Sequence, residues 1–196
     1  MTEKKTKSKS SPMAKFLKTA MGVDPIFSDG TPQLALIGRS NVGKSSTLNA
    51  LTGVKKLAIT SATPGRTRGI NIFSWEDYYL VDLPGYGYAK LPDKERRRLS
   101  QLMGWYLFND CFSPRLVIQI IDARLGPTPA DLEILKLLEA NERRVLLIAN
   151  KSDKIKAGDW AKIRRLLVNK LESRPVFFYS AKTGMGVSEI LKEILC

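Results

Sequence analysis

Residues 38–45 read Gly38-Arg39-Ser40-Asn41-Val42-Gly43-Lys44-Ser45. The apolar run 33–37 precedes this stretch and a helical pattern follows it, which gives the order strand, turn, helix. Backbone N–H groups in such a turn, together with the helix N-terminus, form a cage of donors for phosphate oxygens. Gly38 and Gly43 allow the tight turn, and Lys44 is placed to reach the β- and γ-phosphates as a catalytic residue. The Ser45 hydroxyl suits Mg²⁺, so the stretch predicts a bound nucleoside triphosphate.

Apolar runs and helical patterns alternate on both sides of this stretch. Strands are expected at 33–37, 70–75, 79–82, 116–122, 145–149 and 175–179, and helices near 43–53, 92–109, 129–141, 159–171 and 187–195. Continuous apolar strands separated by helices indicate a parallel sheet covered on both faces. Only Glu76 and Asp77 separate 70–75 from the following strand, which is too short for a parallel crossover. We therefore expect an α/β, three-layer P-loop NTPase fold with a six-stranded, mostly parallel sheet and one antiparallel edge strand.

The composition limits the class of protein and its partners. A chain of 196 residues with 43% hydrophobic and 26% charged residues fits one globular domain. The formal net charge of +13 indicates a polyanionic partner, either nucleic acid or an anionic membrane surface. Cys111 and Cys196 have no metal-ligand or disulfide spacing, which favours a reducing cytoplasm. Histidine is absent, so catalysis has to come from positioning and electrostatics.

The N-terminal region has a different character from the rest of the chain. Lysine, serine and threonine dominate its first dozen residues, and no apolar segment follows that would make it a secretory signal or a membrane span. Residues 1–22 are expected to be a basic, largely disordered tail, and residues 23–196 a single nucleotide-binding domain. The weak amphipathic pattern over 13–21 leaves a surface-lying helix open.

A second motif, Asp82-Leu83-Pro84-Gly85, ends the strand 79–82. An aspartate at a strand end is placed to hold Mg²⁺ through its water shell, and the Gly85 N–H can reach a γ-phosphate as a catalytic group. The Asp-x-x-Gly pattern alone is weak evidence for a nucleotide site. Its position on a strand downstream of the phosphate loop is what supports the assignment.

Two further motifs point to the base. Asn150-Lys151-Ser152-Asp153 ends the strand 145–149, and Ser180-Ala181-Lys182 follows the last strand. The Asp153 carboxylate can accept both the ring N–H and the exocyclic amine of guanine, a pair that adenine lacks. The Lys151 stem can lie on the base plane, Asn150 can tie this loop to the phosphate loop, and the Ala181 N–H can meet guanine O6.

The loop 61–69 lies between these motifs and is rich in glycine and threonine. A threonine there can join Mg²⁺ and the γ-phosphate, so that the loop orders with GTP and relaxes on hydrolysis. Thr67 is preferred over Thr63 as this catalytic and metal-binding residue, because a preceding glycine permits close backbone approach. The segment Gly65-Arg66-Thr67 is therefore expected to contact the nucleotide.

Four motifs in this order, at the carboxyl ends of successive strands, predict a guanine-nucleotide site. The chain as a whole resembles the EngB-type (YihA/YsxC) bacterial ribosome-assembly GTPases of the TrmE–Era–EngA–septin-like superclass. The resemblance covers about residues 15–196 and is carried by 38–45, 63–67, 82–90 and 122–127, of which Gly85-Tyr86-Gly87-Tyr88-Ala89-Lys90 is the most family-specific. It implies a Ras-like G domain and a GTP- and Mg²⁺-dependent GTPase. It also implies a role in large-subunit ribosome assembly, normal cell division and septation. Asn150 is a mild departure, since close relatives often carry threonine there.

Two residues bear on the rate of hydrolysis. Tyr86 stands where GTPases of the Ras type place a water-orienting glutamine, so slow intrinsic hydrolysis completed by a partner is expected. Asn41 matches an asparagine that coordinates K⁺ in some relatives, and a K⁺ ion would supply positive charge at the transition state. The alternative, that Asn41 only stabilises the turn, stays open.

Basic residues form two clusters that favour contact with the rRNA phosphate backbone over a merely solvated face. One contains Lys90, Lys94, Arg96, Arg97 and Arg98, and the other Lys162, Arg164, Arg165 and Lys170. The expected partner is a precursor of the large ribosomal subunit, with the protein monomeric when unbound. Two alternatives are a switch acting on cell-division or membrane-associated partners and a metabolic kinase with the same phosphate loop.

Overall fold

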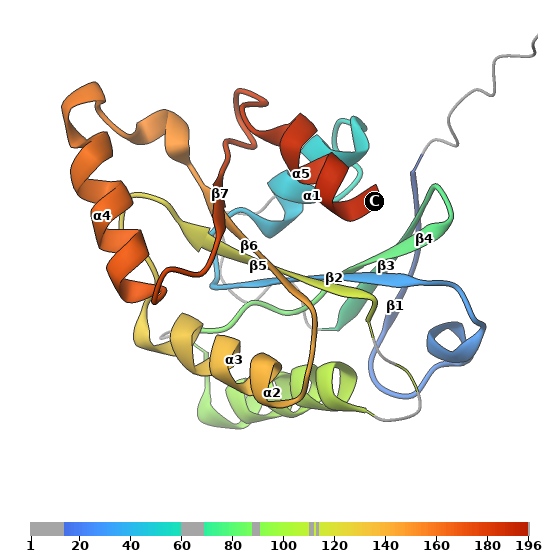
Figure 1. Cartoon of the computed structure of the whole chain (residues 1–196). Coiled ribbons are helices and arrows are strands. Elements are labelled where there is room, and N and C mark those ends of the chain that lie inside the picture. Colours follow the sequence, from blue (N-terminus) through green and yellow to red (C-terminus); the bar gives the residue numbers. More distant parts are fainter. Residues whose placement is uncertain (1–13, 60–68, 88–90, 110–111, 113, 196) are drawn as a thin grey trace, which may run out of the picture.

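The computed structural model describes residues 14–59, 69–87, 91–109, 112 and 114–195. Seven strands form one sheet in the order β1-β3-β4-β2-β5-β6-β7 (Figure 1). The strands are β1 Lys15–Ala20, β2 Gln33–Gly38, β3 Ile70–Trp75, β4 Tyr78–Asp82, β5 Leu116–Asp122, β6 Val145–Asn150 and β7 Val176–Phe178. The predicted α/β class and mostly parallel sheet are confirmed.

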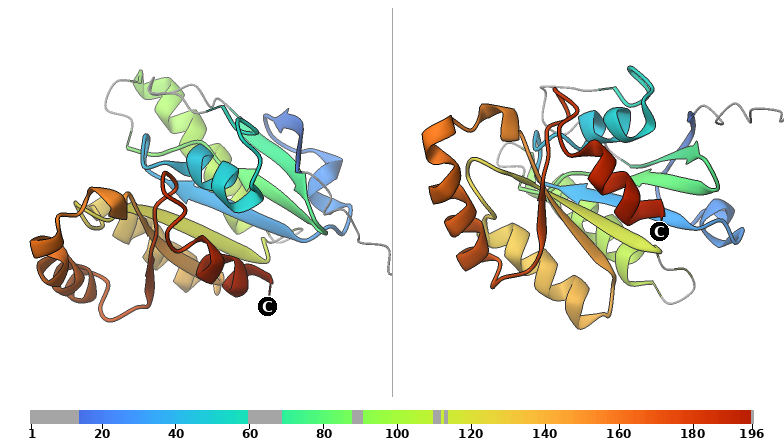
Figure 2. Two further views of the ribbon diagram at one scale, coloured as in Figure 1. Left: turned by 90° about the horizontal axis from the view of Figure 1, so that it is seen from above. Right: turned by 45° about the horizontal axis from the view of Figure 1, so that its top comes forward.

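Helices cover both faces of the sheet, as expected for three layers (Figures 1 and 2). In Figure 1, α1 and α5 lie above the sheet, and α2 and α3 lie below it. The helices are α1 Lys44–Thr52, α2 Asp93–Phe108, α3 Pro129–Ala140, α4 Trp160–Lys170 and α5 Val187–Leu195, with short 3-10 turns at Pro25–Ser28, Ser152–Lys154 and Ala157–Asp159. Two large apolar cores follow from this arrangement, one on each face of the central strands.

Strand β2 lies at the centre of the sheet, and all six of its residues are buried. It pairs in parallel with β4 on one side and with β5 on the other. The chain thus crosses to opposite sides of β2, which opens a crevice at the carboxyl ends of these strands. The phosphate loop begins at that point.

The expected hairpin between β3 and β4 is confirmed. The two strands pair antiparallel up to Trp75 and Tyr78, and only Glu76 and Asp77 turn the chain. Glu76 has a φ of 50°, the left-handed conformation that so tight a turn requires.

The sheet has one strand more than the six expected, and the antiparallel β3 is not its outermost strand. Lys15–Ala20, which we assigned to the tail 1–22 or to a surface-lying helix, forms β1 and pairs antiparallel with β3. Five of its six side chains are exposed, so no apolar alternation marks it in the sequence. Backbone pairing and an edge-to-face contact of Phe16 with Phe73, 5.4 Å between ring centres, hold it instead.

Candidate functional site

The carboxyl ends of β2, β4, β6 and β7 bring four of the predicted motifs to one edge of the sheet. Three of the predicted residues, Gly65, Arg66 and Thr67, lie outside the described part of the chain, as do Thr63 and Lys90. The contacts below therefore concern the phosphate loop, 82–87, 150–153 and 180–182.

The phosphate loop needs both of its glycines. Gly43 has a φ of 108°, and a Cβ there would collide with the side-chain amide nitrogen of Asn150. A Cβ on Gly38 would lie 2.7 Å from the carbonyl oxygen of Ile120. Helix α1 begins at Lys44, and Gly43 before it has no side chain to cap the helix, so the N–H groups of the first turn remain available to an anion. Ser45 is half-buried in that first turn.

The opposite charges of Lys44 and Asp82 interact beside this loop. Burial lowers the pKa of Lys44, and the charge of Asp82 opposes that shift. Burial likewise raises the pKa of Asp82, opposed by the charge of Lys44 and by a hydrogen bond with the Asn71 side chain. The Lys44 ammonium donates to the carbonyl oxygen of Gly38 over a long 3.5 Å. A lysine held this loosely can turn toward a phosphate.

The surroundings of Asp82 suit a metal ion. Asp82 is only 2% exposed, and its Oδ1 has no hydrogen-bond partner among the residues described. A buried carboxylate oxygen without a partner is costly unless a ligand satisfies it. No group of three or more acidic, histidine or cysteine side chains suited to a metal occurs in the described ranges. A single buried carboxylate oxygen without a partner fits Mg²⁺, which keeps most of its waters and relies on few protein oxygens.

The segment after Asp82 runs along the phosphate loop. The N–H of Ser40 donates to the carbonyl oxygen of Tyr86 over 3.0 Å, and Leu83 N–H donates to Leu36 over 3.2 Å. The Tyr86 hydroxyl donates to Asp131 Oδ1 of α3 over 2.7 Å. Burial, followed by the nearby charge of Asp131, raises the pKa of this hydroxyl. Tyr86 is thus directed to α3, and residues 85–87 line a cavity of about 350 Å³ together with side chains of α2 and α3.

Asn150 joins three of the motifs. Its side-chain N–H₂ donates to the Val42 carbonyl oxygen over 2.9 Å. Its Oδ1 accepts the N–H of Lys151 at 2.7 Å and that of Ala181 at 3.1 Å. The predicted tie between this loop and the phosphate loop is confirmed.

The remaining predicted residues at this end of the sheet are Ser152, Asp153, Ser180 and Lys182. The Ser180 hydroxyl donates to Asp153 Oδ1 over 2.7 Å, while the aspartate itself stays exposed. Ser152 is buried and bonds the backbone of Ala149 and Tyr179, so its role is to join the two strand ends. Lys182 is exposed.

Asp122 is a member of the site to which sequence reasoning gave no role. The Lys151 ammonium lies 2.9 Å from Asp122 Oδ2 and donates to the carbonyl oxygen of Asn41 over 2.8 Å. Burial opposes ionisation of Asp122, but hydrogen bonds from Arg124 and Lys151 outweigh it and lower its pKa to about 2. Asp122 pairs directly with Asn150 across β5 and β6. Its position at the end of a buried strand, like that of Asp82, was the signal available.

Known proteins resemble this chain over most of its length. Residues 33–151 match the family model described as "50S ribosome-binding GTPase". The probable GTP-binding protein EngB of Halothermothrix orenii is 42% identical over 188 residues, which cover 92% of this chain and 93% of that protein. The EngB of Solibacter usitatus is 40% identical over 94% of this chain and 96% of its own length.

Solved structures agree with these relatives. A crystal structure of a probable GTP-binding protein EngB has a TM-score of 0.70 and 25% identity, covering 83% of this chain and 96% of that one. The structure of Era with MgGDPNP and nucleotides of 16S ribosomal RNA has a TM-score of 0.67 and 26% identity over 84% of this chain and 55% of its own. Within the described residues, no helix is long and apolar enough to cross a membrane. Because the EngB proteins of Halothermothrix orenii and Solibacter usitatus match it at 40% identity or more over nearly their whole length, the chain belongs to the EngB family of GTPases.

Proposed function

We propose that this protein is a GTP-driven switch with slow intrinsic hydrolysis that assists assembly of the large ribosomal subunit. The main support for nucleotide binding is the Asn150 side chain, which hydrogen-bonds both Val42 and Ala181. These two contacts hold the loop of the exposed Asp153 carboxylate against the phosphate loop. The residues proposed to bind the guanine base and those proposed to bind the phosphates would therefore keep a fixed position relative to one another.

The phosphate end is assigned to residues 38–45. Backbone N–H groups of this loop and the uncapped start of α1 would hold the β- and γ-phosphates, with Lys44 as the charged contact. Ser45 and Asp82, the latter through water, would hold Mg²⁺, which supplies positive charge between the phosphates. Thr67 is proposed as the further metal ligand, and Gly65, Arg66, Leu83, Pro84 and Gly85 as nucleotide contacts.

Slow hydrolysis follows from the position of Tyr86. Its hydroxyl is engaged with Asp131, so it is not available to orient an attacking water. A partner, or a K⁺ ion beside Asn41, would then complete the transition-state charge. The backbone of Asn41 has a φ of 61° and its carbonyl accepts from Lys151, which fixes the loop where that ion would sit.

The output of the switch is assigned to α2. This helix follows the segment 82–87, and the cavity beside that segment gives it room to change conformation with the nucleotide. Lys94, Arg96, Arg97 and Arg98 are all exposed on α2, and Lys162, Arg164, Arg165 and Lys170 are exposed on α4. Such faces suit contact with rRNA phosphates. The description of the matched family names the 50S subunit, and Era was solved with a ribosomal RNA fragment. Effects on cell division and septation would follow from ribosome supply.

A pelleting experiment tests this proposal. The protein is sedimented with large-subunit precursors in a non-hydrolysable GTP analogue, in GDP and without nucleotide, at several salt concentrations. We expect association that is strongest with the analogue and falls steeply with salt. Anionic vesicles serve as the competing partner. Binding to vesicles but not to the subunit would favour a switch acting on membrane-associated or cell-division partners, and GTP-independent binding to both would sink the proposed switch.

A further inference from the structure

Three polar side chains stand in one row across three strands. Thr19 of β1 is the direct cross-strand partner of Asn71 in β3, and Asn71 is the direct partner of Asp82 in β4. Thr19 Oγ1 donates to Asn71 Oδ1 over 2.7 Å, and the Asn71 side chain hydrogen-bonds the Asp82 carboxylate. The row therefore runs from the outermost strand to the buried carboxylate of the candidate metal site.

The chemistry of the three groups fixes the direction of the hydrogen bonds. An ionised carboxylate only accepts, so the Asn71 N–H₂ has to face Asp82. The Asn71 carbonyl oxygen then faces Thr19, whose hydroxyl supplies the matching proton. Thr19 thus selects the amide orientation in which a donor meets Asp82.

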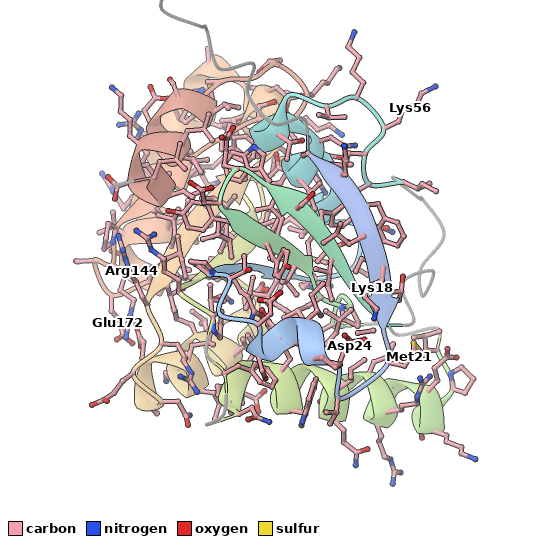
Figure 3. The ribbon with its side chains drawn as sticks, turned by 90° about the vertical axis from the view of Figure 1, so that its right-hand side faces the viewer. Lys18, Met21, Asp24, Lys56, Arg144 and Glu172 are labelled. Carbon is pink, nitrogen blue, oxygen red and sulfur yellow. The ribbon has the colours of Figure 1, made fainter. Side chains whose placement is uncertain are left out.

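A bulge in β1 is what puts Thr19 in this row. Phe16 pairs with Phe73, and regular pairing would next place Lys18 opposite Asn71. The register shifts between Phe16 and Lys18, so Lys18 pairs with Ile72 and Thr19 with Asn71. Lys18 instead forms an ion pair with Asp24, 2.6 Å apart, and Figure 3 shows these two side chains together beside β1.

We propose that Asn71, oriented by Thr19, is a positioning residue for Asp82 and sets how tightly the site holds Mg²⁺. The inference rests on the proposed nucleotide and metal site. Groups that hydrogen-bond a metal-linked carboxylate fix its orientation, and their loss costs about 10- to 100-fold in metal affinity. With Asn71 engaged, the Asp82 carboxylate cannot rotate freely, and its Oδ1, which has no hydrogen-bond partner among the described residues, keeps one direction.

The test measures Mg²⁺ dependence rather than GTPase activity. Release of a fluorescent GDP analogue is followed at a series of free Mg²⁺ concentrations and in EDTA. For N71A we expect the Mg²⁺ concentration that gives half-maximal slowing to rise about tenfold. The release rate in EDTA is expected to stay that of the wild type, because Asn71 is not among the residues proposed to contact the nucleotide. Ser74→Ala is the matched control, since Ser74 is a half-buried polar residue of the same strand that pairs with Lys15.

A second pair of variants keeps the inference testable if N71A does not fold. Thr19 is exposed, so T19V and T19S are both compatible with the fold. T19V removes the hydroxyl and is expected to raise the half-maximal Mg²⁺ concentration about threefold, while T19S keeps the wild-type value. Equal behaviour of T19V and T19S, or an unchanged Mg²⁺ dependence in N71A, would overturn the inference. If wild-type release were itself independent of Mg²⁺, the proposed metal site would fail instead.

Discussion

The Asn150 side chain donates to the carbonyl oxygen of Val42, 2.9 Å away and 108 positions earlier in the chain. The same side chain accepts the N–H of Ala181. Through this one residue, the loops assigned to the base and to the phosphates form a single unit.

Replacement of Asn150 by alanine should weaken both stability and nucleotide binding. The change leaves the buried Val42 carbonyl and the Ala181 N–H without partners, at a cost of about 1–3 kcal/mol. Denaturant unfolding and titration with a fluorescent GDP analogue measure the two effects. Asn141→Ala is the control, because the Asn141 side chain is exposed and donates to the Leu137 carbonyl oxygen at the end of its own helix. Equal losses in both variants would contradict the bridge.

Replacement of Asp153 by alanine should remove the preference for guanine. A hydrogen bond to a charged group contributes about 1.5–3 kcal/mol, so GDP affinity should fall by roughly 10- to 100-fold. Competition of GDP and ADP for the site gives the ratio directly. Asp159→Ala changes an exposed acid nearby and should leave that ratio alone. A D153A protein that still chooses GDP over ADP as the wild type does would remove Asp153 from the proposed base contacts.

The contacts of Asp122 with Arg124 and Lys151 should make stability depend on pH. The folded pKa of Asp122 is about 2, below its ordinary 3.8, so these contacts with Arg124 and Lys151 stabilise the protein above about pH 4. That contribution is lost as the pH falls from about 4 to 2. We expect D122N to unfold more easily than the wild type at pH 7, by on the order of 2 kcal/mol, and the gap to shrink near pH 2.5. Asp77→Asn, at an exposed turn, should show no such gap. A gap constant with pH would point to packing instead.

Tyr86→Phe should destabilise the protein without slowing its chemistry. The loss of the hydrogen bond to Asp131 should cost about 1–2 kcal/mol, because that bond is partly buried and charged. The intrinsic GTPase rate should stay within about twofold, since the hydroxyl faces α3. Tyr79→Phe, which removes an exposed hydroxyl bonded to Asp29, is the control for stability. A tenfold slower Y86F enzyme would give the hydroxyl a part in hydrolysis after all.

The proposed K⁺ site beside Asn41 predicts a cation effect on rate. GTP hydrolysis should be faster in KCl than in NaCl at the same ionic strength, because only K⁺ would fill the site. Asn41→Ala should remove the difference. Equal rates of the wild type in the two salts would leave Asn41 as a residue of the turn.

Much of this molecule could be read from the chain because its signals are local. The apolar run into Gly38 and the two-residue turn at Glu76 follow from patterns a few residues long, and the structure has both. Strand β1 could not be predicted in this way, because its stability comes from backbone pairing with β3 and its side chains are mostly exposed. Asp122 and Asn71 were missed for a related reason. Their partners are set by sheet register, which no single motif contains.

The extra residue in β1 has a consequence for comparing relatives. If β1 kept the same residues but paired regularly from Phe16 onward, without the bulge, the Lys18 side chain would stand opposite Asn71. The sequences of the nucleotide motifs would be unchanged, yet the Lys18 ammonium would stand where the Thr19 hydroxyl now orients the Asn71 amide. On the proposed role of Asn71, two chains with the same motifs would therefore differ in their affinity for Mg²⁺ through the presence or absence of one bulge far upstream.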